Sequence, residues 1–403
     1  MKPLAPVEAT LIAGIDQQRM LARTLEWAAV NSGTGNLAGL AQLADMLANA
    51  FAALPGEVTL REPAAVTAVD AQGREVEQAH GRHLVCSVRP QADRRFLLTG
   101  HMDTVYPADH PFQSLLWLDQ DCLNGPGTAD MKGGIAVIVE ALLALETSPD
   151  AARVGYDVMI NADEETGSLS SAALIAELAQ GKFAALTYEP SALPDGTLAH
   201  ARGGSGNYTL TFAGRSAHAG RNPHEGRNAL VAAADAAVRL KEMQHADLPI
   251  NPARIEGGAA NNVVPDHALL RFNIRPKSTE AAEQFAHDLN ALIATLAIEH
   301  DLSISVHGGI SRPPKPVDAR AQKLFDLVKA SGADLGQAIG WQPSGGVCDG
   351  NNIAAAHVPV VDTMGVRGGA IHSPDEYMFA SSLTERAQLS AVVLHRLATG
   401  DCL

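Results

Sequence analysis

The sequence predicts an α/β protein with a mixed, largely parallel sheet flanked by helices, and a second domain inserted into the first. Strand and helix patterns alternate from about Gln17 to Glu189, which favours parallel strands joined by helices. A compact strand–helix–strand–helix block follows, and the Pro-rich stretch Ser311–Pro316 then suggests a linker back to the first domain. We therefore expect a first domain over residues 1–200 and 310–403, and an inserted domain over residues 201–309.

The elements of the first domain follow from the period of the apolar residues. A period near 3.6 residues indicates an amphipathic helix, whereas a short apolar run between turn residues indicates a buried strand. Helices are expected over Gln17–Trp27, Leu37–Ala53, Gly133–Glu146 and Leu169–Ala179, with two or more beyond Val317. Strands are expected over Glu57–Leu60, His83–Val88, Arg95–Gly100, Tyr156–Asn161 and Val358–Asp362.

The inserted block has its own alternation of elements. Strands are expected over Asn207–Ala213, Ala268–Ile274 and Ser303–His307, and helices over Gly226–Met243 and Thr279–Leu296. This block is long enough to bury a small core of its own.

Composition excludes several classes of protein. Of the 403 residues 46% are apolar and 19% are charged, so a disordered chain is not expected. The formal net charge of -15 would repel a polyphosphate backbone, which argues against a nucleic-acid partner. No apolar run is long enough to span a membrane, and the first residues lack the apolar core of a secretory signal. The four cysteines form no CxxC pair, so we expect a reduced, cytoplasmic protein without a thiolate zinc site: Cys86, Cys122, Cys348 and Cys402.

The first chemically informative segment is an apolar strand that delivers His101 and Asp103 at its carboxyl end. Sites in open α/β sheets form at that edge. Residues two apart on a strand share a face, so Asp103 can orient the ring of His101 while the other ring nitrogen binds a metal. A polar strand end with an incidental histidine is the alternative interpretation.

The second segment is the glycine-rich loop that carries Asp130 into a helix. A phosphate-binding loop would need G-x-x-x-x-G-K-[ST] or G-x-G-x-x-G, and neither spacing is present. The glycines instead let the backbone pack closely around Asp130, whose carboxylate is favoured by the amino end of the helix. An ordinary helix cap remains the alternative for this residue.

Two further strands end in acids, and a histidine lies near the end of the chain. The strand Val158–Asn161 runs into Asp163, Glu164 and Glu165, and a second strand ends at Glu189. Crowded carboxylates at a sheet edge are costly without a cation, although acids at a turn are commonly a solvated surface. Two histidines, His101 and His372, and three carboxylates delivered by separate loops form a set suited to zinc, for which cobalt or manganese could substitute. A carboxylate shared between two ions would make a two-metal site.

These segments resemble the zinc metallopeptidase family that includes acetylornithine deacetylase, succinyl-diaminopimelate desuccinylase, aminoacylase and glutamate carboxypeptidase, with the glutamate carboxypeptidases most similar. The resemblance covers nearly the whole chain from about Asp16, and its motifs agree in order and spacing. They are GHMDTVYP, GPGTADMKGG, NADEETGS, the Glu of TYEPS, GRSAHAG and IHSPDEY. It implies a zinc-exopeptidase-like catalytic domain with an inserted ferredoxin-like α+β domain that serves as a lid and in dimerisation.

The resemblance also implies a role for each metal-site residue. Asp130 bridges two zinc ions, with His101 and Glu189 on one ion and Glu165 and His372 on the other. Asp103 supports His101. Glu164 is the general base, which takes a proton from the metal-bound water and later gives it to the leaving amine.

The resemblance also implies that residues of the inserted domain and of one loop late in the chain contact the substrate. His218 matches a lid histidine that in relatives reaches the neighbouring subunit's active site and stabilises the oxyanion. Asn262 and Arg275 match positions that bind the carboxylate end of the substrate, for which an Arg fork is suited. The loop containing Gly346 and Cys348 matches a substrate-side glycine loop.

Two departures from the family pattern bear on specificity. Cys348 stands where relatives usually have Ser or Thr; it is expected to line the substrate pocket or pack, since a cysteine nucleophile would need a nearby base. Arg202 occurs in the segment where glutamate carboxypeptidase has a lysine, which leaves a preference for glutamate open.

We therefore expect a homodimeric di-zinc hydrolase of a small amide or peptide next to a free carboxylate, of the glutamate carboxypeptidase type. An N-acyl amino acid deacylase of the acetylornithine deacetylase or aminoacylase type is the alternative enzyme. A catalytically silent, metal-binding dimerisation protein is the alternative outside enzymes, and the presence of Glu164 argues against it.

Overall fold

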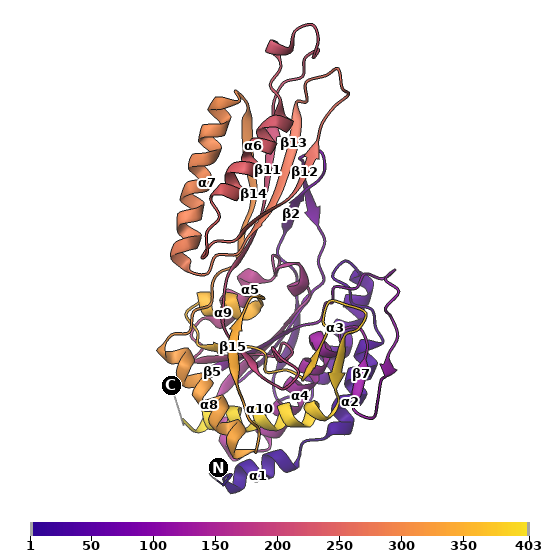
Figure 1. Ribbon diagram of the computed structural model, residues 1–403. Helices are drawn as coiled ribbons and strands as arrows, with labels where there is room; N and C mark the ends of the chain where they lie inside the picture. The colour runs from indigo at the N-terminus through magenta and orange to yellow at the C-terminus, as the bar shows by residue number, and fades with distance from the viewer. Residues whose placement is uncertain (1–2, 401–403) are drawn as a thin grey trace. The chain divides into compact units, whose positions relative to one another are not determined.

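The computed structural model describes residues 3–400 and divides the chain into two compact units (Figure 1). Unit 2 contains Ala65–Gln78 and Arg202–Lys315, and unit 1 contains the rest of the described chain. The inserted domain was expected at residues 201–309. The structure adds the segment Ala65–Gln78, so the chain crosses between the units at four points, after Ala64, Gln78, Ala201 and Lys315. Cys402 lies outside the described residues.

Unit 1 is built on a six-stranded mixed sheet in the order β1-β4-β8-β5-β9-β16. The strands β8, β5, β9 and β16 are parallel, whereas β4 is antiparallel to both of its neighbours. The α/β class and the largely parallel sheet are therefore confirmed. The bounds are β1 (Glu57–Arg61), β4 (His83–Val88), β5 (Arg95–His101), β8 (Gly155–Asn161), β9 (Ala184–Thr187) and β16 (Val360–Val361).

Helices cover both faces of this sheet because its strands are apolar on both sides. Every residue of β8 and every residue of β9 is buried. One face packs against α2 (Gln17–Ala28), α3 (Leu37–Phe51), α4 (Gly133–Glu146), α8 (Ala319–Asp334) and α10 (Ser381–Thr399). The other face packs against the shorter helices α5 (Ala172–Ala179) and α9 (Asp349–Ala355). Helix α1 (Pro6–Ala13) packs on α10.

Unit 1 also has a smaller antiparallel sheet, in the order β17-β18-β7-β6. Its strands adjoin, along the chain, the two loops that carry Asp130 and His372. Strand β7 leads into the Asp130 loop, and the connection from β17 to β18 carries His372. The bounds are β6 (Leu116–Trp117), β7 (Cys122–Asn124), β17 (Gly368–Gly369) and β18 (Tyr377–Phe379). A separate strand pair joins β10 (Leu198–Arg202) to β15 (Trp341–Ser344).

Unit 2 has the β-α-β-β-α-β order of a ferredoxin-like fold. Its antiparallel sheet runs β12-β13-β11-β14, and the apolar face of the sheet packs against α6 and α7. The bounds are β11 (Ser205–Ala213), α6 (Ala229–Glu242), β12 (Ile250–Gly257), β13 (His267–Ile274), α7 (Thr279–Glu299) and β14 (Ser303–Arg312).

The hairpin of β2 (Val66–Val69) and β3 (Glu75–Gln78) belongs to unit 2 through contacts that are remote in sequence. The side chain of Arg271 donates to the carbonyl oxygen of Val69 at 2.8 Å, and the hydroxyl of Thr67 lies 3.2 Å from Nε2 of His307. Arg271 alternates on β13 with Leu270 and Phe272, which pack toward the helices, and His307 on β14 has the opposite parity to Ile304, which does the same; the hairpin therefore lies on the other face of the sheet.

Three sequence-based expectations differ from the structure. The stretch Ser311–Pro316 is not linker throughout, because β14 pairs with β11 as far as Arg312. Strand β12 was not expected, since it contains Pro252 and has mostly exposed side chains that give no apolar pattern. The helix expected from Leu169 begins at Ala172, because Ser168 to Ser171 form a turn. Among the described residues, no helix is both long and apolar enough to cross a membrane.

Candidate metal centre

Three adjacent parallel strands of unit 1 deliver candidate ligands at their carboxyl ends. His101 is the last residue of β5, and it lies opposite Asn161, the last residue of β8, after which the chain turns through Glu164 and Glu165. On the other side of β5, strand β9 ends two residues before Glu189. Since these strands are hydrogen-bonded neighbours, the sheet itself brings the histidine and the acids to one edge.

Asp130 lies between two histidines that come from distant parts of the chain. Its Oδ1 atom is 3.0 Å from Nε2 of His101, and its Oδ2 atom is 3.4 Å from Nε2 of His372. The same nitrogen of His101 is 3.5 Å from Oε2 of Glu189, and that of His372 is 3.2 Å from Oε2 of Glu165. The five residues therefore form two groups that share the Asp130 carboxylate, with one oxygen in each group.

The ring of His101 is oriented by the residue two positions later. Its Nδ1 atom lies 3.0 Å from the carbonyl oxygen of Asp103 and 3.4 Å from Oδ1 of the same residue. Because a carbonyl oxygen only accepts, Nδ1 carries the proton and donates it. In the neutral ring Nε2 then presents its lone pair toward Asp130 and Glu189, which is the arrangement that a metal ion requires.

Burial and charge at this site fit a cation. Burial and the charge of Asp130 raise the pKa of Glu165 to about 7, and burial raises the pKa of Glu189 as well. Burial opposes protonation of His101, but the surrounding carboxylates outweigh it and raise its pKa. The buried Oε1 atom of Glu189 accepts no hydrogen bond from the described residues. Three crowded carboxylates with an unused buried oxygen and two histidine nitrogens are a donor set suited to divalent metals.

Asp103 also holds the turn that carries the two glutamates. Its Oδ1 atom accepts the backbone N–H of Glu164 and its Oδ2 atom accepts that of Glu165, each at 3.1 Å. The hydroxyl of Thr34 donates to Oδ2 at 2.8 Å. This carboxylate therefore links the His101 side of the site to the acidic turn.

An Asp103→Asn variant is expected to lose metal affinity by about 10–100-fold, as is typical when a residue behind the ligands is replaced. The amide nitrogen of Asn would face a backbone N–H, which leaves two donors opposed in a buried place and costs about 1–3 kcal/mol of unfolding free energy. Metal titration and thermal denaturation measure both effects. Asp119→Asn is the matched control, because Asp119 also accepts two backbone N–H groups but is exposed. Equal metal affinity in the Asp103 variant and the wild type would contradict this role.

The structure adds two buried residues that the sequence analysis did not select. Glu376 and Tyr106 contact each other at 2.9 Å, and the carboxylate of Glu376 also accepts from the backbone of the Asp130 loop. The only available sequence signal was the position of Glu376 in the same IHSPDEY motif as His372.

The two candidate residues in the glycine-rich loop before α9, Gly346 and Cys348, differ in exposure to solvent. Gly346 is exposed, whereas Cys348 is buried as the N-cap of α9. The thiol of Cys348 points toward Oδ2 of Asp362 at 3.7 Å. Its packing in the interior favours the structural interpretation of this cysteine over the pocket interpretation.

In unit 2 the structure brings His218 and Asn262 together. The backbones of His218 and Val263 form a β-bridge, and the carbonyl of Asn262 accepts from the N–H of Ala219 at 2.9 Å. Both residues are exposed. The Nδ1 atom of His218 accepts the backbone N–H groups of Gly220 and Arg221, so the neutral ring carries its proton on Nε2.

Arg275 lies apart from this pair within unit 2. Asn262, which contacts the segment of His218, precedes the first residue of β13, whereas Arg275 follows its last residue. The eight residues of β13 span about 26 Å at the usual rise of a strand. Arg275 is exposed, and its Nε atom donates to Asn273 at 2.9 Å.

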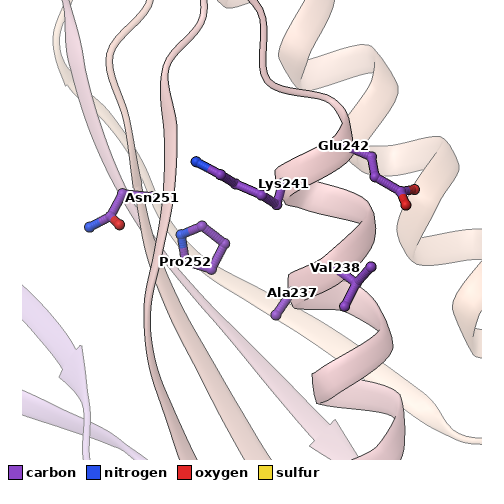
Figure 2. Close-up of a pocket in the computed structure, with 6 residues that line it drawn as sticks. All are labelled: Ala237, Val238, Lys241, Glu242, Asn251 and Pro252. Atoms are coloured by element: carbon purple, nitrogen blue, oxygen red, sulfur yellow. The ribbon is translucent and has the colours of Figure 1, made fainter.

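Two other features of unit 2 do not form a comparable centre. Asp235, Glu299 and His300 lie close enough to hold an ion, but Arg239 already occupies the space by bonding to both acids. A groove of about 480 Å³ between α6 and β12 has a single Lys and a single Glu among its lining residues (Figure 2). These are Ala237, Val238, Lys241, Glu242, Asn251 and Pro252.

The chain is similar in sequence and fold to known peptidases and to a desuccinylase. The sequence profile of Peptidase family M20/M25/M40 matches residues 97–396. Carboxypeptidase G2 from Pseudomonas sp. (strain RS-16) is 28% identical over 401 residues, which cover 96% of this chain and 92% of that protein. Succinyl-diaminopimelate desuccinylase from Halorhodospira halophila is 28% identical and covers 76% of this chain and 84% of its own. A dinuclear metal binding peptidase from Bacillus subtilis superposes with a TM-score of 0.67 at 14% identity, covering 95% of this chain and 98% of its own.

Proposed function

Because the chain belongs to Peptidase family M20/M25/M40, we propose that it is a two-metal hydrolase that cleaves an amide or peptide bond next to a free carboxylate. The observation that carries this proposal is the Asp130 carboxylate, whose two oxygens face His101 and His372 separately. Shared carboxylates of this kind hold paired ions about 3.5–4 Å apart in aminopeptidases and phosphatases.

The proposed ligands divide into two sets around Asp130. His101 and Glu189 would hold one ion, and Glu165 and His372 the other. Zinc suits this mixture of nitrogen and oxygen donors, with cobalt or manganese as substitutes. Bound ions would polarise the scissile carbonyl and make water more acidic, which is the chemistry that the residues alone lack.

Glu164 is proposed as the general base. One of its carboxylate oxygens lies within 4.8 Å of ligand atoms of His101 and Glu189, yet the pairs around Asp130 are complete without it. A carboxylate beside the attacking water can take its proton and deliver it to the leaving amine. The Asp103 carboxylate supports this by fixing the backbone of the turn.

His218 is proposed to donate from Nε2 to the oxygen that becomes negative as water attacks. Asn262 and Arg275 are proposed to bind the substrate's carboxylate, with exposed Gly346 forming part of the pocket wall and buried Cys348 packing behind it. Since His218 and Arg275 flank opposite ends of β13, we propose that a complete site uses His218 from one copy and Arg275 from the other. This requires a homodimer formed through unit 2.

The surface of unit 2 supports such a dimer. Val231 and Val238 on α6 are 53% and 58% exposed, and β12 is an edge strand. The groove in Figure 2 lies between these two elements. Exposed apolar side chains beside an unpaired strand edge are typical of an interface.

Mixing two inactive variants tests the shared site. His218→Ala and Glu164→Gln dimers, exchanged by mild denaturation and refolding, are expected to regain roughly a quarter of the wild-type activity, since half of the dimers are mixed and each has one complete site. Glu164→Gln mixed with Asp130→Ala is the control, because both residues belong to unit 1 and no complementation is expected there. No recovery in the first mixture would show that each site uses its own His218.

Substrate class is proposed from the named relatives and from the family. The glutamate carboxypeptidase type is favoured by the match to carboxypeptidase G2 along nearly the whole chain. The desuccinylase match supports the second candidate, an N-acyl amino acid deacylase, and a silent metal-binding protein is the third. We further propose that the protein acts in the cytoplasm, where thiols such as those of Cys86 and Cys122, which form no disulfide in the structure, would stay reduced.

Hydrolysis assays with the full chain test these candidates. The protein is stripped with a chelator, reloaded with zinc, and given folate, dipeptides, and N-acetyl and N-succinyl amino acids. Zinc-restored turnover is expected, fastest on substrates with a C-terminal glutamate. Faster turnover of the N-acyl amino acids would favour the deacylase, and two bound metals without turnover on any substrate would favour the silent protein.

A further inference from the structure

Glu376 is a buried carboxylate whose two oxygens are both occupied by donors from the Asp130 loop and its surroundings. Only 1% of the surface of Glu376 is exposed. Oε1 accepts the backbone N–H groups of Ala129 and Asp130, each at 3.1 Å. Oε2 accepts the N–H of Gly127 at 3.2 Å and faces the hydroxyl of Tyr106 at 2.9 Å.

The main chain of Glu376 contacts the same loop. Its carbonyl oxygen accepts the N–H of Gly125 at 3.2 Å and the side-chain amide of Asn124 at 2.7 Å. The hydroxyl of Tyr106 also lies 2.8 Å from the carbonyl oxygen of Ser373. This one residue therefore ties the segment that carries Asp130 to the segment that carries His372.

The chemistry of these contacts requires a carboxylate. Backbone N–H groups can only donate, so the three of them need acceptors on both oxygens of the side chain. A glutamine of the same size would turn an NH₂ group toward either Gly127 or the pair Ala129 and Asp130. Two donors would then face each other in a buried place, which the loop can relieve only by moving.

We propose that Glu376 is a positioning residue that sets the backbone of Asp130 relative to His372, so that the Asp130 carboxylate can face both histidines. The proposal rests on the two-metal function proposed above. Glu376 itself is proposed to touch neither substrate nor metal. It acts on the shared carboxylate through the peptide N–H of Asp130 and on His372 through their common loop.

The test compares Glu376→Gln with wild type by titrating the stripped full-length chain with Co²⁺. Glu376→Gln is expected to bind Co²⁺ about 10–100-fold more weakly and to show an altered visible spectrum, since residues behind the ligands commonly have effects of this size. Glu140→Gln is the matched control, because Glu140 is equally buried but accepts from Arg19 and the N–H of Asp16, at the amino end of α2. Its melting temperature should fall without a change in Co²⁺ affinity or spectrum.

Each result has a definite meaning. A folded Glu376→Gln protein with wild-type affinity and spectrum overturns the positioning role. Equal losses of Co²⁺ affinity in Glu376→Gln and Glu140→Gln also overturn it, because the effect would then follow from stability alone. If Glu376→Gln does not fold, Tyr106→Phe, which removes one contact to Oε2, must still shift the spectrum. Absence of Co²⁺ binding in the wild type would instead overturn the two-metal function on which the proposal rests.

Discussion

Replacing Glu164 by Gln is expected to lower kcat by about 10²–10⁴-fold, which is the usual contribution of a general acid–base group. The change removes the proton-accepting oxygen and keeps the size of the side chain. The ligand set around Asp130 is complete without Glu164, so two metals per chain and a nearly unchanged KM are expected. Steady-state kinetics and metal analysis of the same preparation measure both.

Glu177→Gln provides the matched control for that experiment. Glu177 lies on α5 in the same unit, is exposed, and pairs only loosely with Arg61 at 3.6 Å. Its kcat should equal that of the wild type. If Glu164→Gln retained more than a tenth of the wild-type kcat, another group would have to carry the proton.

Removing the shared ligand is expected to have the second large effect. Asp130→Ala should bind neither metal tightly, because each proposed ion loses one of its three protein ligands and the two ions lose their common carboxylate. His372→Ala should retain one ion, held by His101, Asp130 and Glu189. Turnover should be undetectable in both variants.

Metal content after dialysis separates these two outcomes. The expected series is two ions in wild type, one in His372→Ala, and none in Asp130→Ala. Loss of the same number of ions in both variants would contradict a shared carboxylate. Circular dichroism of each variant must show that unit 1 remains folded for the comparison to hold.

The positions of the candidate ligands at strand ends could be predicted because each ends or follows a recognisable apolar strand. His101 and Glu189 end neighbouring strands, and the geometry of a parallel sheet then forces them to the same edge. No such rule predicts where Asp130 and His372 lie, since both are in loops whose paths depend on contacts with other segments. Only the family resemblance pairs them in the sequence, and the structure places Nε2 of His372 3.4 Å from Oδ2 of Asp130.

The role of Glu376 could not be predicted from its position in the sequence. Its backbone donors are the N–H groups of Gly127, Ala129 and Asp130, and backbone groups leave no signature in residue identity. The assignment of Ala65–Gln78 to unit 2 was missed for a related reason. The sequence of a short hairpin with exposed residues indicates where its turn lies, but not which unit the hairpin packs on. That depends on the contact with Arg271, which is remote in sequence.

The ligand order along the chain bears on how the enzyme matures in the cell. His101, Asp130, Glu165 and Glu189 are all synthesised before the main segment of unit 2, Arg202–Lys315, whereas His372 and Glu376 are synthesised after it. Domains generally fold as they emerge from the ribosome, with the earlier ones first. A nascent chain can therefore present all three proposed ligands of one ion early, but it lacks the proposed histidine ligand of the second ion until residue 372 has emerged. We therefore expect hydrolytic activity to appear only after the segment that carries His372 has emerged, so that a shorter nascent chain stays inactive on the ribosome.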